Sequence, residues 1–87
     1  MQNDQKALYD NADKFILLAN ELAKSDPSGS VGAGLRFAAA RYSAFEASLR
    51  TSSLAEDKVA QQQLFASEFS AMLEINLDAY IKIQSQN

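Results

Sequence analysis

Hydrophobic residues recur along most of the chain at alternating spacings of four and three, which places them on one face of a helix. The first such stripe consists of Leu8, Ala12, Phe15, Ala19 and Leu22. It predicts a helix over about residues 4–24, with Asn3 or Asp4 as its N-terminal cap. A turn follows, because residues 25–30 contain Pro27 and Gly29 among serines.

The second stripe keeps the same spacing and consists of Val31, Leu35, Ala38, Tyr42, Phe45 and Leu49. It predicts a helix over about residues 31–50, capped by the Ser30 hydroxyl as acceptor of a backbone N–H. Small residues and Phe37 occupy much of the remaining circumference. We therefore expect other parts of the fold to pack on more than one side of this helix.

A third helix is predicted over about residues 54–84, because the segment Ser53–Glu56 has the pattern of a capping box. At 1.5 Å per residue it would be roughly 45 Å long. Its apolar face consists of Phe65, Phe69, Met72, Leu73, Tyr80 and Ile83. A polar stretch precedes this face, so we expect residues 54–63 to overhang the bundle, or the helix to bend near Gln61–Gln63.

Three amphipathic helices with short connections predict an all-α fold, an antiparallel up-down-up three-helix bundle with a long third helix. We expect a single helical domain over residues 1–87, and no sheet, because no segment alternates with period two. The predicted core is one buried cluster: Leu8, Phe15, Leu22, Leu35, Tyr42, Phe45, Leu49, Phe65, Phe69, Met72 and Leu73.

Composition excludes several classes of function. The 87 residues include neither Cys nor His, which rules out disulfides, a Ser-His-Asp triad, and zinc or haem held by imidazole or thiolate. We therefore assign no catalytic, cofactor-binding or metal-binding residue, and expect no cofactor. The net charge of −3 disfavours nucleic-acid binding. The chain has no apolar run long enough to span a bilayer and begins without a secretion signal, so we expect a cytoplasmic location and no membrane partner.

Glu46 is the charged residue nearest the predicted core. Arg50 follows it by four residues, the spacing of a helical ion pair, so we expect structural pairing. The alternative is a small anionic-ligand binder or minor enzyme that uses Glu46 with Arg41 or Arg50, because arginine matches carboxylate and phosphate groups.

Several stretches together resemble a known family: Tyr9–Phe15, Leu18–Glu21, Val31–Gly32, Phe37–Phe45 and Asn76–Ile81. The resemblance is to a proteobacterial family of short, soluble, all-helical proteins labelled only as a domain of unknown function. It implies an all-helical architecture and a bacterial, cytoplasmic origin. It assigns no role to any residue.

The leading hypothesis for function is a non-enzymatic interaction module. The helix at 31–50 has more apolar surface than one neighbour covers, so it could pair with a second copy, as a homodimer, or with another protein. Alternatively, the helices at 4–24 and 54–84 cover both of its apolar rows between them.

Overall fold

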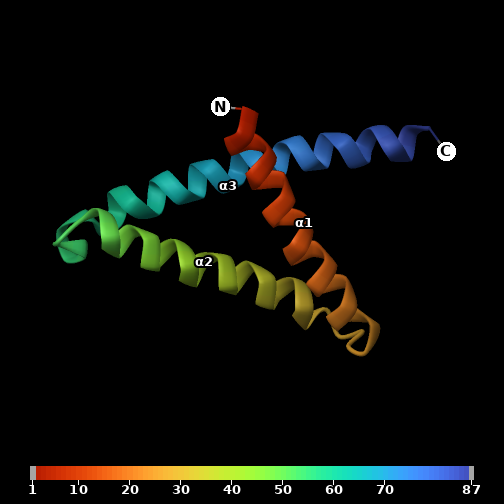
Figure 1. Ribbon diagram of the computed structural model, residues 1–87, viewed down its shortest axis with the longest axis horizontal. Helices are drawn as coiled ribbons and strands as arrows, with labels where there is room; N and C mark the ends of the chain where they lie inside the picture. The colour runs from red at the N-terminus through yellow and green to blue at the C-terminus, as the bar shows by residue number, and fades with distance from the viewer. Residues whose placement is uncertain (1, 87) are drawn as a thin grey trace. The chain divides into compact units, whose positions relative to one another are not determined.

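Three α-helices make up the computed structural model, which describes residues 2–86 (Figure 1). They are α1 (Gln2–Lys24), α2 (Ser30–Arg50) and α3 (Leu54–Ser85), and residues 2–86 contain no strand. The predicted helices are confirmed to within two residues at each end. The all-α fold is confirmed as well: the described residues form three helices, and the third is the longest. Helix α3 is continuous through Gln61–Gln63.

The chain divides into two compact units, Met1–Tyr42 and Ser43–Asn87. The first unit contains α1 and the first part of α2. The second contains the last two turns of α2 and all of α3. In each unit, two helices that are consecutive in the chain pack against each other.

Asp26 organises the turn between α1 and α2. Its carboxylate accepts hydrogen bonds from the backbone N–H of Ser28 at 3.0 Å and from the hydroxyls of Ser28 and Ser30, each at 2.6 Å. Gly29 has a φ of 88°, which glycine adopts without the strain that a Cβ would cause. The predicted cap is therefore wrong in its bonding, because Ser30 is the first residue of α2 and its hydroxyl donates to Asp26.

The start of α1 also differs from the prediction. The helix begins at Gln2, so Asp4 lies in its first turn, and the side chain of Asn3 lies outside the described residues. Asp4 still suits this position, because a carboxylate near a helix N-terminus interacts favourably with the helix dipole.

Thr51 holds the connection between α2 and α3. Its hydroxyl donates to the Asp57 carboxylate at 2.5 Å and accepts the backbone N–H of Ser53 at 3.0 Å. Ser53 is the N-cap of α3, as predicted, but its side chain makes no capping hydrogen bond. The Ser53 carbonyl instead accepts the N–H groups of Glu56 and Asp57.

The predicted core is not buried. Ala47, 3% exposed, is the one buried residue among those whose side chains are described. Phe65 is half-buried, and the other predicted core residues are exposed: Leu8, Phe15, Leu22, Leu35, Tyr42, Phe45, Leu49, Phe69, Met72 and Leu73. The reason is geometric, because a pair of helices covers only a narrow stripe on each partner, and a broad apolar arc needs more neighbours.

Candidate interaction surface

The side of α2 that faces α3 in the second unit is mostly polar. Its half-buried or buried residues are Ser43, Glu46 and Ala47 on α2, and Asp57, Gln61 and Phe65 on α3. These α3 positions are four residues apart and share one face. The prediction that α3 overhangs at its start is therefore wrong: the short connection at residues 51–53 brings the first turns of α3 against α2, and every described residue after Phe65 is exposed.

The apolar stripe of α2 points elsewhere. Ala47 is two residues from both Phe45 and Leu49, so it lies about 200° around the helix from each of them. Phe45 is 52% exposed and Leu49 is 72% exposed. Within its own unit, α2 therefore turns a small-residue and polar side toward α3 and leaves large apolar side chains at the surface.

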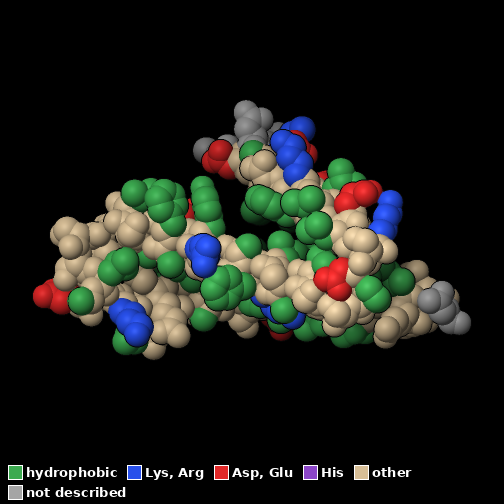
Figure 2. Space-filling view, turned by 90° about the horizontal axis from the view of Figure 1, so that it is seen from below, with side chains coloured by type: hydrophobic (Ala, Val, Ile, Leu, Met, Phe, Trp, Pro, Cys, Tyr) green, Lys and Arg blue, Asp and Glu red, His purple; other side chains and the backbone are tan. Residues whose placement is uncertain are grey.

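A second exposed apolar stripe runs along the C-terminal half of α3. We call it the α3 stripe, and its members are Phe69, Met72, Asn76, Tyr80 and Ile83. With the spacing 4-3-4-4-3 from Phe65, it continues the same face that α2 covers at the start of the helix. All five side chains are exposed. Asn76 is the polar member, and its Nδ2 donates to the Met72 carbonyl at 2.8 Å. Figure 2 shows hydrophobic side chains exposed over much of the face in view.

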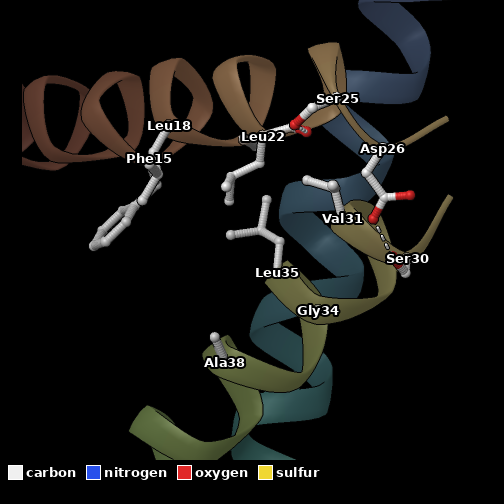
Figure 3. Close-up of a pocket in the computed structure, with 11 residues that line it drawn as sticks. Phe15, Leu18, Leu22, Ser25, Asp26, Ser30, Val31, Gly34, Leu35 and Ala38 are labelled. Carbon is white, nitrogen blue, oxygen red and sulfur yellow. Dashed lines mark hydrogen bonds between the residues drawn. The ribbon is translucent and has the colours of Figure 1, made fainter. Parts of the chain in front are cut away.

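The first unit has an apolar pocket of about 530 Å³ between α1 and α2, close to their connecting turn (Figure 3). Leu22 of α1 and Leu35 of α2 point toward one another there, with Val31 beside them. Asp26 is the charged residue of the lining. Because Asp26 accepts hydrogen bonds from the side chain of Ser28, the side chain of Ser30 and the backbone of Ser28, its pKa is lowered to about 2. The pocket therefore has an anionic edge, which is unsuitable for an anionic ligand.

The structure does not bring Glu46 into an ion pair. The Arg50 guanidinium lies over the Phe65 ring, 5.2 Å from its centroid, and that of Arg41 lies over Phe37 at 5.3 Å. Within the described part of the chain, no salt bridge or hydrogen bond joins Glu46 to either arginine. The expected Glu46–Arg50 pair is therefore wrong, because Arg50 stacks on an α3 ring instead. None of the three residues lines the pocket.

Helix α1 has two ion pairs at its surface. Lys6 pairs with Asp10 at 2.7 Å and Lys24 with Glu21 at 3.0 Å, and all four are well exposed. Pairs of this kind contribute little to stability. Across the described residues, no group of three acidic side chains is arranged to hold a metal ion.

Residues 8–81 match the family described as "Protein of unknown function (DUF3144)". The chain belongs to this family. The match covers most of α1, all of α2 and most of α3. Neither a curated protein nor a solved structure matches the chain.

Among the described residues of this DUF3144 protein, no helix is both long enough and apolar enough to cross a membrane. Sequence reasoning assigned two members of the α3 stripe, Phe69 and Met72, to the core. The exposure of the stripe could have been suspected from Asn76, a polar residue at a position that the stripe otherwise gives to large apolar side chains.

Proposed function

We propose that this DUF3144 protein is a non-enzymatic helical interaction module of the cytoplasm that pairs with a second copy of itself. The observation that supports the proposal is the distribution of side chains in the second unit. Polar residues such as Glu46 and Gln61 are half-buried between the helices, while Leu49 and Phe69 are at the surface. Large exposed apolar patches are typical of protein interaction sites.

The size of known homodimer interfaces indicates how much contact such a pair needs. Obligate homodimers bury about 2,000–5,000 Å² in total, or roughly 1,000–2,500 Å² per chain.

Two exposed stripes could supply that interface: the α2 stripe around Leu49 and the α3 stripe. The cysteine-free sequence suits a reducing compartment, since it needs no disulfide. A ligand site built on Glu46 has less support, because its arginine partners stack on Phe37 and Phe65 and the apolar pocket lies in the other unit.

Sedimentation equilibrium of the full chain over about 1–100 μM tests the proposal. We expect a mass of twice 9.5 kDa at the upper concentrations, and a melting temperature that rises with concentration, because association stabilises the folded chain. A monomer at 100 μM whose melting temperature is independent of concentration would overturn the proposal. It would mean that the apolar stripes are covered within one chain.

A further inference from the structure

We infer that the second copy pairs antiparallel through the α3 stripe, with Asn76 at the two-fold axis. This inference rests on the proposed self-association and specifies its surface. It starts from a symmetry in the spacing of the stripe. Phe69 and Ile83 are each seven residues from Asn76, and Met72 and Tyr80 are each four residues from it.

That symmetry is what a two-fold helix pair requires. When two copies of one helix pack antiparallel about a residue, positions at equal distances before and after it lie opposite each other. Phe69 of one chain then lies level with Ile83 of the other, and Met72 lies level with Tyr80. Both pairs join a large apolar side chain to another over a contact about 21 Å long.

Charge favours the same arrangement. Glu68 and Lys82 lie on the same flank of the stripe, about 80° and 120° from its centre. Residues on one flank face each other in an antiparallel pair, so Glu68 of each chain comes within two residues, or about 3 Å along the axis, of Lys82 in the other. A parallel pair would instead place the flank of Glu68 against the opposite flank of the partner, which holds Leu73 and Leu77, and away from Lys82. Both side chains are exposed, and no salt bridge within the described residues engages either.

Asn76 fits the axis position. Its bond to the Met72 carbonyl uses one of the two amide N–H groups, so the other N–H and the amide oxygen have the chemistry to pair with Asn76 of the second copy. A single asparagine in an apolar helix seam is a known device for fixing register. On the other flank, Leu73 and Leu77 are exposed and extend the apolar contact.

Cysteine cross-linking tests the register, because the natural chain has no cysteine. We expect Asn76→Cys to form an intermolecular disulfide readily under mild oxidation at concentrations where the protein is a dimer. Glu74→Cys is the matched control: it lies on the same helix but about 200° around it from Asn76, and should cross-link at least tenfold more slowly. If the protein is dimeric and the two variants cross-link equally, this inference is wrong while the proposed self-association stands.

Charge exchange tests the direction of the pair. Glu68→Lys places two lysines together at each end of an antiparallel seam, so the dissociation constant should rise about tenfold. The double variant Glu68→Lys/Lys82→Glu should restore it to within about threefold, which a parallel pair would not predict. Circular dichroism of each variant would check that helix content is retained. A single variant that binds as tightly as the natural protein, or a double variant without rescue, would overturn the antiparallel arrangement.

Discussion

Ile83 and Ile81 offer a matched test of whether the α3 stripe is covered in solution. Both are isoleucines near the end of α3, and they are 53% and 61% exposed. Ile83 belongs to the stripe, whereas Ile81 lies about 140° around the helix from its centre. Replacing each with aspartate introduces the same charge at positions only two residues apart, but on opposite faces of α3.

The expected magnitude follows from the exposure of Ile83. Burying a whole isoleucine contributes about 1.5–3 kcal/mol, so covering the half that the single chain leaves exposed contributes about 1 kcal/mol. A two-fold interface contains this residue twice, which gives about 2 kcal/mol, or roughly a 30-fold change in the dissociation constant. Ile83→Asp should weaken the dimer by at least this factor, because a carboxylate would also have to be desolvated. Ile81→Asp should change it less than about threefold.

Sedimentation velocity over a concentration series measures both dissociation constants, and circular dichroism shows whether each variant keeps its helices. Equal effects of the two substitutions would refute the reasoning. In a monomer the two side chains are almost equally exposed, so nothing in the single chain distinguishes them.

Three further predictions concern local structure. Asp26→Asn should remove a pH-dependent part of the free energy of unfolding. The lowered pKa of Asp26 stabilises the fold above about pH 4, and this contribution disappears as the pH falls toward 2. Thermal melts of the natural chain and the variant should therefore converge near pH 2. Gly29→Ala should destabilise by about 1–2 kcal/mol in urea unfolding, because its φ is 88°, whereas Gly34→Ala, inside α2 with open space around it, should stabilise by about 0.5–1 kcal/mol. Glu46→Gln should change stability by less than about 0.5 kcal/mol in the same assay, and a loss above 1 kcal/mol would show that Glu46 has an ionic partner in solution.

The helices could be predicted from the sequence because the signals that start and stop them are local. Pro27 and Gly29 end one helical run, and the serines near residue 53 start the next. These residues act on backbone conformation within a few positions, so no knowledge of the rest of the fold is needed. The hydrogen bonds at the helix starts were less predictable. Ser30 and Ser53 stand at the expected positions, but each donates a hydrogen bond to a neighbour, Ser30 to Asp26 and Ser53 to Thr51.

The packed faces could not be predicted in the same way. An apolar stripe shows that a face will be covered, but not which element covers it. On α2, apolar residues occupy most of the circumference, so the periodicity of Phe45 and Leu49 could not indicate that Ala47 would be the buried position. The small side chain of Ala47 allows close approach of α3, and this advantage is invisible in a search for large hydrophobic residues.

The polar contact between α2 and α3 has a consequence for how the protein responds to mutation. Glu46 and Gln61 lie between α2 and α3, whereas Phe69 and Ile83 are exposed farther along α3. The apolar area that would stabilise the proposed dimer is therefore distinct from the contacts that define the α2–α3 hairpin. Substitutions in the α3 stripe should therefore reduce affinity while the helices persist, whereas changes at Ala47 should disturb the hairpin itself. If the proposed dimer forms, stability and association are linked through concentration, because each dimer would remove apolar surface that a single chain leaves in water.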